Sequence, residues 1–302
     1  MTVESIDDLR SSLSYHLRAK NRAPETCRQY GQALAKFAGW LETKGQPLDL
    51  PAISTQAVEQ YIVSLATDGG ERKRTLSQST IRYHYAGLRA VFRWHAKREG
   101  YQNPMQFMDP PKVDETQKDI VSVEDAQRVL RHLDQAGRYR DAAIISLLID
   151  DGLRASELCA LLNTDVDWKK GLAVIRHTKN GDMRLAPLLP ATLERLDTWR
   201  AKRRDKSSPC LFTGQSGGPL TIYGLYQLVR RTFTECGIPN IGPHDLRHSM
   251  ATAYMNNPEA RESDLKVVGG WRSDSIVRRY SKKGKEDRAM AAFRVHSPMA
   301  NR

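Results

Sequence analysis

The 302-residue chain has no long apolar run and only four cysteines. Because a membrane helix needs about 18 to 20 apolar residues and the opening MTVESIDDLR is polar and acidic, we expect neither a membrane span nor a signal peptide. The cysteines Cys27, Cys159, Cys210 and Cys236 lack C-x-x-C spacing, which argues against a disulfide framework and against a zinc knuckle. A glycine-rich loop of Walker type is also missing. We therefore expect a cytoplasmic protein without a metal or another cofactor.

Positive charge is abundant instead. Lys and Arg number 47 against 35 Asp and Glu, a formal net charge of +12. This balance favours a polyanionic partner over a small acidic substrate. The length is sufficient for two domains, each with its own core.

Residues 5–100 have the apolar periodicity of helices and little else. One helix has its apolar stripe at Tyr30, Leu34, Phe37 and Leu41. A later helix, over about 77–98, carries basic residues on one side, which fits a DNA backbone, although a merely solvated face would give the same pattern. The candidate DNA-binding residues are Arg82, Arg89 and Arg93 on this helix and Arg74 in the loop before it.

Residues 101–121 contain three prolines and no sustained period, so they are predicted to be an interdomain linker. This divides the chain into a helical domain over 1–100, the linker over 101–121 and a mixed domain over 122–302. The second domain begins with a helix that Ser122 caps, with Asp125 in the third position. Further helices are expected over about 191–202 and 222–235, with a short strand around Leu211 and Phe212.

Two candidate cations follow in the second domain. A buried helix over 140–150 ends at Asp151 and Gly152, and Arg154 comes directly after it. A half-buried arginine needs an anion, which is either a phosphate or a structural partner such as Glu157. Residues 173–188 alternate on both sides of Asn180-Gly181, a strong hairpin signal, and Lys179 stands beside that turn.

The stretch from Pro243 to Tyr280 holds the remaining candidates. His244 and Arg247 are three residues apart on a helix that begins at Pro243, so both can face one group. A metal site at His244 and His248 is disfavoured, because Arg247 lies between them. Trp271 follows two glycines, and Tyr280 is a phenol preceded by Arg278 and Arg279. Cations around such a phenol suit attack on a phosphodiester.

Four features of the sequence together resemble the tyrosine recombinase (phage integrase) family. They are HDLRHSMAT, the GGW turn, the Tyr nine residues after its Trp, and the upstream GLRASEL. The resemblance covers nearly the whole chain. It implies a multidomain, mainly α fold: a helical N-terminal core-binding (SAM-like) domain and an α+β catalytic domain with a small antiparallel sheet. It also implies an enzyme that cuts and rejoins DNA at specific sites through a 3′-phosphotyrosyl intermediate.

The same resemblance assigns roles to six residues. Arg154 and Arg247 would clamp the phosphate, Tyr280 would attack it, and His244 would assist proton transfer at the tyrosine. Lys179 would protonate the leaving 5′ oxygen, with Arg184 as a lower-ranked alternative. Trp271 would donate its indole N–H to the phosphate. The common family residue at this position is His. Trp271 can donate a hydrogen bond but cannot accept a proton, so it cannot serve as a base here.

The implied partner is double-stranded DNA with inverted half-sites, bound by a homotetramer on paired sites, with an accessory DNA-bending protein as a further expected partner. We expect a location at the nucleoid and no separate arm-site domain. Integration of a phage or mobile element is the first expectation and resolution of replicon dimers the second. A type IB topoisomerase and an inactive DNA-binding protein are the remaining alternatives. The segment after Tyr280 docks either on a neighbouring subunit or on its own core.

Overall fold

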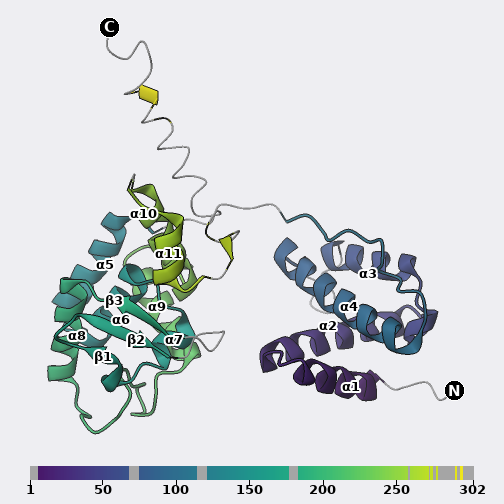
Figure 1. Cartoon of the computed structure of the whole chain (residues 1–302), viewed down its shortest axis with the longest axis horizontal. Coiled ribbons are helices and arrows are strands. Elements are labelled where there is room, and N and C mark those ends of the chain that lie inside the picture. Colours follow the sequence, from purple (N-terminus) through teal and green to yellow (C-terminus); the bar gives the residue numbers. More distant parts are fainter. Residues whose placement is uncertain are drawn as a thin grey trace. The chain divides into compact units, whose positions relative to one another are not determined.

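The computed structural model describes residues 6–67, 75–113, 121–176, 183–257, 259–271, 273–274, 277, 290 and 293–294. The chain divides into two compact units, Met1–Thr116 and Gln117–Arg302 (Figure 1). No helix in the described ranges combines the length and the apolar character that a membrane crossing requires.

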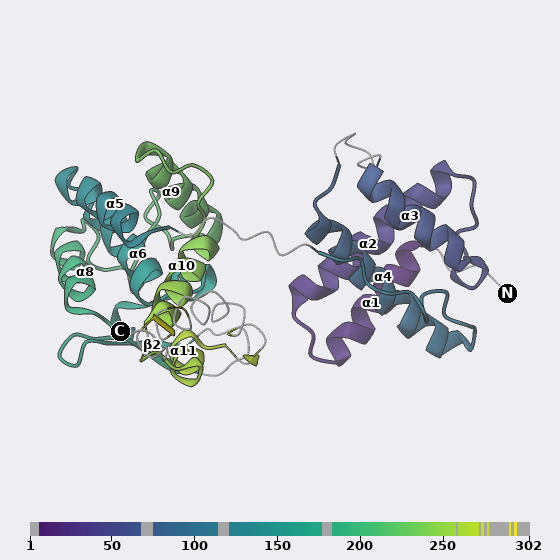
Figure 2. The same cartoon turned by 90° about the horizontal axis from the view of Figure 1, so that it is seen from above.

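The N-terminal unit is helical, as the periodicity of residues 5–100 predicted. Its elements are α1 (Ile6–Ala19), α2 (Pro24–Thr43), the short 3-10 helix η1 (Leu50–Ala52), α3 (Thr55–Thr67) and α4 (Gln78–Glu99). Helices α2 and α4 pack against each other, α1 packs on α2, and α3 packs on α4 (Figure 2). The predicted stripe on α2 supplies Leu34, Phe37 and Leu41 to the core, where all three are buried.

Helix α4 is fixed at both ends by its own sequence. At its start the Ser77 hydroxyl accepts a hydrogen bond from the Thr80 N–H at 3.2 Å, which satisfies a backbone donor that the helix leaves unpaired. At its end Gly100 takes the left-handed conformation that terminates helices. Leu88 and Phe92 are buried on its inner face, so the opposite face is held toward solvent.

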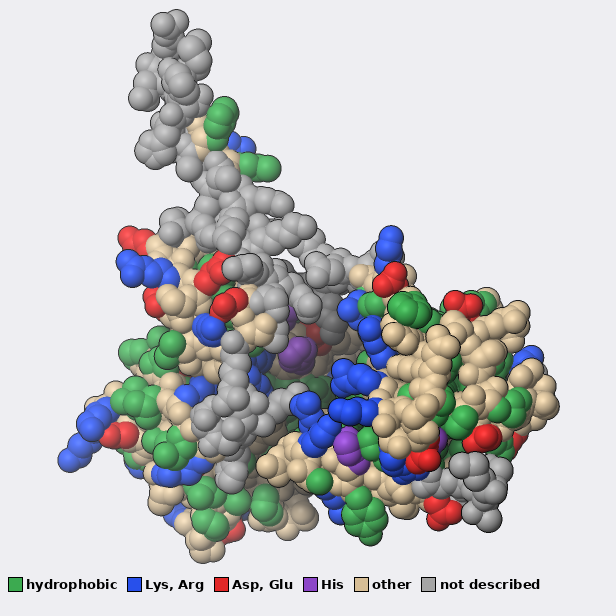
Figure 3. All heavy atoms as spheres, turned by 45° about the vertical axis from the view of Figure 1, so that its right-hand side comes forward, with side chains coloured by type: hydrophobic (Ala, Val, Ile, Leu, Met, Phe, Trp, Pro, Cys, Tyr) green, Lys and Arg blue, Asp and Glu red, His purple; other side chains and the backbone are tan. Residues whose placement is uncertain are grey.

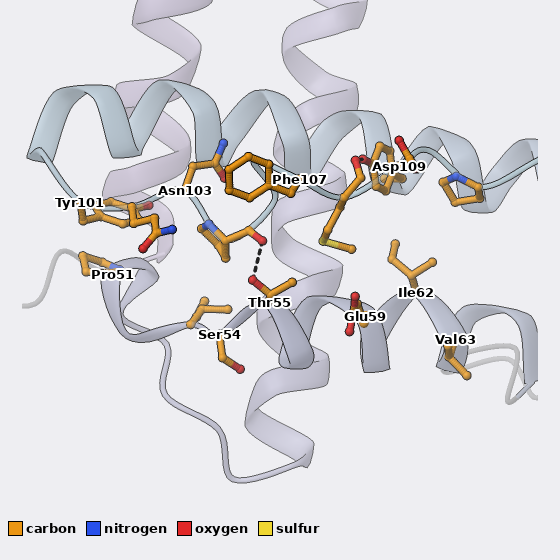
Figure 4. A pocket seen from close by; sticks show the side chains of 16 residues that line it. Pro51, Ser54, Thr55, Glu59, Ile62, Val63, Tyr101, Asn103, Phe107 and Asp109 are labelled. Carbon is orange, nitrogen blue, oxygen red and sulfur yellow. Dashed lines mark hydrogen bonds between the residues drawn. The ribbon is translucent and has the colours of Figure 1, made fainter.

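Residues 101–113 pack on the N-terminal unit, although the whole segment 101–121 was predicted to be a linker. Met105 is buried in the core of that unit. The Thr55 hydroxyl donates to the Pro104 carbonyl at 2.7 Å (Figure 4), and the Tyr85 hydroxyl donates to the Met108 carbonyl. The prolines of this segment led to the linker prediction. A chain without regular structure can nevertheless bury apolar side chains when its backbone polar groups find hydrogen-bond partners. An open groove remains between this segment and α3, lined by Phe107 among others (Figure 4).

The C-terminal unit is mixed. Its elements are α5 (Val123–Gln135), α6 (Tyr139–Asp150), α7 (Ala155–Cys159), the 3-10 helix η3 (Asn163–Asp165), β1 (Val166–Asp167), β2 (Leu172–Ile175), β3 (Arg184–Pro187), α8 (Pro190–Lys202), α9 (Ile222–Glu235), α10 (Pro243–Asn256) and α11 (Glu262–Gly269). Helix α6 is central, since it contacts α5, α8 and α10 (Figure 1). The predicted cap of α5 is present, with the Ser122 hydroxyl accepting from the Asp125 N–H at 3.0 Å.

The strands form one antiparallel sheet in the order β1-β2-β3. Strands β2 and β3 pair from Leu172 opposite Pro187 to Ile175 opposite Arg184, so the predicted hairpin strands are confirmed. The strand expected at Leu211 and Phe212 is wrong: in this described stretch only isolated bridges occur nearby, at Cys210 and at Thr213. Both apolar side chains are buried in the core instead, and no ladder runs through them because the bridges on either side pair with different segments, Cys210 with Leu162 and Thr213 with Pro219.

The predicted fold class, mainly α with a small antiparallel sheet, therefore agrees with the described residues.

Candidate active site

Helix α10 holds two of the predicted site residues. It begins at Pro243, and the Asp245 carboxylate accepts from the Gly242 N–H at 3.0 Å, which caps the first turn. The His244 side chain is exposed, whereas Arg247 is only 1% exposed. The helix thus places the imidazole at the surface and the guanidinium inside the unit.

Arg154 lies at the N-cap of α7. Its backbone N–H and its side chain both donate to the Glu157 carboxylate, at 3.0 Å and 2.5 Å. The structural ion pair considered from the sequence is therefore present. The same guanidinium also reaches across the unit and donates to the Gly270 carbonyl at 2.6 Å, so the ion pair does not prevent Arg154 from facing the Gly-Gly-Trp turn.

Arg247 approaches that turn from the other side. Its side chain donates to the Gly269 carbonyl at 2.6 Å and to the Gly152 carbonyl, which precedes Arg154 by two residues. The guanidinium carbon lies 3.9 Å from the centre of the Trp271 ring, in the range of a cation–π contact. Arg154, Arg247 and Trp271 are thus brought together.

Both glycines of the turn are required by its geometry. Gly270 caps α11 with φ of 65°, a left-handed conformation that other residues adopt at a cost. A Cβ on Gly269 would lie 1.7 Å from an atom of the Trp271 ring. The glycine pair therefore lets the indole fold back against the end of the helix.

Three arginines converge on the end of α11. The carbonyls of Val268, Gly269 and Gly270 accept hydrogen bonds from three separate side chains: Arg184 at 2.5 Å, Arg247 at 2.6 Å and Arg154 at 2.6 Å, respectively. The last carbonyls of a helix have no partner within it and carry its negative partial charge, so they attract cations. From the sequence, Arg184 was considered only as a substitute for Lys179; its partners lie 27 and 84 residues away, beyond any local pattern.

The cluster carries an excess of positive charge. Burial raises the pKa of Glu157, but Arg184 and Arg154 outweigh this effect and hold that pKa below its usual value, so the carboxylate is ionised. Buried Asp151 differs: burial first, then the neighbouring Asp150, raise its pKa to about 8 against the opposing effect of Arg184. Arg154 and Arg184 thus share one ionised carboxylate, Glu157, and the excess of guanidinium over carboxylate suits an anion such as phosphate.

The predicted DNA-binding residues lie on the exposed side of α4. Arg82, Arg89, Arg93 and Lys97, here named the basic stripe, are all exposed. At 100° per residue they fall within about 80° of the helix circumference. Figure 3 shows Lys and Arg side chains gathered on the face of the N-terminal unit in view. Arg89 donates to the Tyr85 hydroxyl at 3.4 Å, and in the described part of the chain none of the four forms an ion pair.

Three predicted residues, Arg74, Lys179 and Tyr280, lie outside the described residues, as does the Asn180-Gly181 turn. Val277, three residues before Tyr280, is described. It is buried in a small cluster with Leu265 and Trp271.

Residues 120–287 match the model of the phage integrase family, and residues 13–100 match the phage integrase N-terminal SAM-like domain. The chain belongs to the phage integrase family. Two curated relatives in this family are tyrosine recombinases. XerC of Halalkalibacterium halodurans is 26% identical over 316 residues, which cover 99% of this chain and 100% of the relative. XerA of Thermococcus onnurineus is 25% identical over 257 residues, which cover 84% of each chain.

Solved structures share the fold of this phage integrase family member. The Tn1549 transposon integrase in complex with transposon right end DNA superposes with a TM-score of 0.74 at 18% identity, covering 97% of this chain and 99% of that one. The XerH recombinase bound to a palindromic difH substrate gives a TM-score of 0.72 at 21% identity, covering 96% and 84%. The tyrosine recombinase fold predicted from the sequence is therefore confirmed.

Membership confirms the resemblance on which the sequence prediction was based, and with it the enzyme class: the chain is a tyrosine recombinase, a site-specific DNA strand transferase. The roles of individual residues are a separate matter and depend on the geometry above.

Proposed function

We propose that this recombinase cleaves DNA at the end of α11, where Arg154 and Arg247 bind the scissile phosphate and Tyr280 attacks it. The observation that supports this most strongly is the convergence of Arg154, Arg247 and Trp271 on one helix end with surplus positive charge. Two of the five N–H groups of the Arg154 guanidinium donate to described acceptors, the Glu157 carboxylate and the Gly270 carbonyl, so three can donate to phosphate oxygens.

The reaction proceeds by substitution at phosphorus. The Tyr280 hydroxyl loses its proton and its oxygen bonds to phosphorus, while the bond to the 5′ oxygen breaks; the products are a 3′-phosphotyrosine and a free 5′ hydroxyl once Lys179 has supplied a proton. A phenol with a pKa near 10 is only about 0.1% ionised at pH 7, so it needs help. The exposed His244 assists its deprotonation, and the arginines stabilise the charge that develops on the phosphate oxygens.

The position of Val277 supports Tyr280 as the nucleophile. Val277 is anchored beside Trp271, and three residues of chain span at most about 11 Å. A tyrosine of the same chain can therefore reach the arginines. The 5′ hydroxyl of a second DNA end then reverses the reaction, which reseals the strand without an external energy source.

We propose that the N-terminal unit holds the DNA through the basic stripe, with Arg74 extending the contact. We also propose that the predicted helical domain (1–100) and catalytic domain (122–302) act as separate domains, with the first part of the predicted linker 101–121, residues 101–113, belonging to the N-terminal domain by its packing. Exposed cations without acidic partners are suited to phosphates, whose contacts position a protein on the duplex. The assembly is a homotetramer on paired inverted half-sites, with an accessory DNA-bending protein, and it acts in the cytoplasm at the nucleoid.

Integration of a mobile element is the proposed biological role. The Tn1549 transposon integrase, whose fold this chain shares over nearly its full length, supports it. Resolution of replicon dimers uses the same chemistry on a different pair of sites and remains the alternative.

The decisive experiment uses a nicked suicide duplex built from DNA that flanks the gene. The wild-type protein should form an adduct that survives boiling in detergent, and Tyr280→Phe should bind the duplex but form none. Tyr254→Phe is the matched control, because Tyr254 lies on α10 with its side chain partly exposed and has no proposed role. An adduct with Tyr280→Phe would show that another residue is the nucleophile, and relaxation of supercoiled plasmid without a target site would favour a topoisomerase.

A further inference from the structure

Arg184 is the third guanidinium at the end of α11, and the proposed mechanism gives it no part. It is the first residue of β3, a strand that contacts α11. One terminal nitrogen donates to the Val268 carbonyl at 2.5 Å, and the other donates to the Glu157 carboxylate at 2.8 Å. Its side chain is 9% exposed and that of Glu157 is 0% exposed.

We infer that Arg184 is a positioning residue for DNA cleavage, which fixes the end of α11 relative to Arg154 by joining Glu157 to the Val268 carbonyl. This inference rests on the proposed function of the site.

A direct contact between Arg184 and DNA does not fit the geometry. Both terminal nitrogens already donate to protein acceptors. The Nε atom is buried, and it has no hydrogen-bond partner among the described residues. Arg184 differs from Arg154, whose side chain is 24% exposed, and from Arg247, which donates to the backbone carbonyls of Gly152 and Gly269. The Arg184 guanidinium is both nearly buried and ion-paired to the buried Glu157 carboxylate, so Arg184 acts through its neighbours.

The hydrogen bonds around Arg184 close a ring. Glu157 accepts from Arg154 and from Arg184, and those two arginines donate to Gly270 and Val268, two residues apart in the chain. The ring links the start of α7, the start of β3 and the end of α11, three segments distant in sequence. Without the Arg184 side chain the ring opens, and of the bonds in the ring only the one from Arg154 to Gly270 still joins the start of α7 to the turn.

The packing is close enough for a small displacement to matter. A Cβ on Gly270 would lie 2.8 Å from Arg184 Nε and 3.5 Å from a terminal nitrogen of Arg154. Both arginines therefore rest against the same glycine. Arg247 donates to the adjacent Gly269 carbonyl and lies over the Trp271 ring. A shift of the turn would therefore move Arg154, Arg247 and Trp271, the three groups proposed to surround the phosphate.

The test compares Arg184→Gln and Arg184→Lys in the full-length protein with Arg203→Gln. Arg203 is the matched control, since it is 5% exposed and holds backbone carbonyls such as those of Ser208 and Cys210, away from the site residues. Three quantities are measured: the rate of covalent adduct formation at saturating suicide duplex, the dissociation constant for DNA, and the melting temperature.

We expect Arg184→Gln to slow adduct formation by about 100-fold, the order of loss that a 1 Å misplacement causes, with an unchanged dissociation constant. Arg184→Lys keeps the charge but has one donor group, so it should recover part of the rate. Arg203→Gln should lower the melting temperature and leave the rate close to wild type at temperatures where it is folded.

The inference is overturned if Arg184→Gln forms the adduct at the wild-type rate, or if its rate loss is matched by Arg203→Gln at an equal loss of melting temperature. If Arg184→Gln does not fold, amide hydrogen exchange of Arg184→Lys decides: faster exchange at Gly270 and Trp271 with unchanged exchange in α9 supports positioning, and unchanged exchange at the turn refutes it. Absence of an adduct from the wild-type protein would instead refute the proposed function.

Discussion

Glu157→Gln should destabilise the C-terminal unit strongly, because the carboxylate is the only acidic partner of two buried or half-buried guanidiniums in the described site. Glutamine keeps the volume and one acceptor oxygen. Its NH₂ group, however, would face arginine donors that can accept nothing. Removing one member of a buried ion pair costs about 3 to 5 kcal/mol.

The size of the effect in temperature follows from the size of the unit. At about 2 to 4 °C per kcal/mol for a unit of this length, the melting temperature should fall by about 6 to 20 °C. Scanning calorimetry of the full-length protein measures it, with the transition of the N-terminal unit as an internal reference. Glu235→Gln is the control: that carboxylate is part-exposed beside Arg138, so its loss should cost about 0 to 1 kcal/mol.

The pH dependence provides an independent check. Because the folded pKa of Glu157 lies below its ordinary value of 4.5, its contribution to stability is present above pH 4.5 and is lost as the pH falls through the folded pKa. The difference between wild type and Glu157→Gln should therefore be full at pH 7 and shrink in acid. If Glu157→Gln had the same melting temperature as Glu235→Gln at pH 7, the buried carboxylate would not hold the cluster together.

Three further predictions concern the turn, the buried acid beside it and the DNA contact. Gly270→Ala should lose about 1 to 2 kcal/mol from the left-handed conformation and more from its contact with Arg184, so urea denaturation should show a larger loss than for Gly217→Ala, which has open space around it; equal losses would argue against the contact. Asp151→Asn should gain stability relative to wild type as the pH rises from 4 to 8. Burial and Asp150 raise the folded pKa of Asp151 to about 8, so the stabilising contribution of its protonated carboxyl group in the wild type is lost over that range. A difference in melting temperature between the two proteins that stays constant with pH would contradict this. Each Arg→Ala change in the basic stripe should reduce the slope of log K against log salt by about 0.9 in a titration, and an unchanged slope would remove that residue from the interface.

Much of the fold was predictable because its signals are local. Apolar stripes defined α2 and α4, and the Asn180-Gly181 pair between alternating runs located β2 and β3. Ser122 marked the start of α5 through a bond that spans three residues. Each of these patterns depends on neighbours in the chain, which a sequence displays directly.

For three of the candidate site residues the sequence predicted a shared location, but not how they are arranged there. The family motif placed Arg154, Arg247 and Trp271 together, and the structure brings them to one helix end. That Arg184 joins them depends on bonds between residues 27 and 84 positions apart, which no spacing rule contains. The strand predicted at Leu211 and Phe212 was wrong for a related reason. The apolar character of these residues predicted their burial correctly, but strand pairing depends on a neighbouring segment that the sequence does not identify.

The packing of residues 101–113 on the N-terminal unit has a practical consequence for building hybrids between members of this family. A junction placed at position 101 would separate the N-terminal unit from Met105, which fills its core, and from the carbonyls that Thr55 and Tyr85 hold. A junction within residues 114–120 would leave those contacts with the donor of the N-terminal half. Transplanting target recognition from one recombinase to another should therefore carry the whole segment through Val113, rather than stop where the last long helix ends.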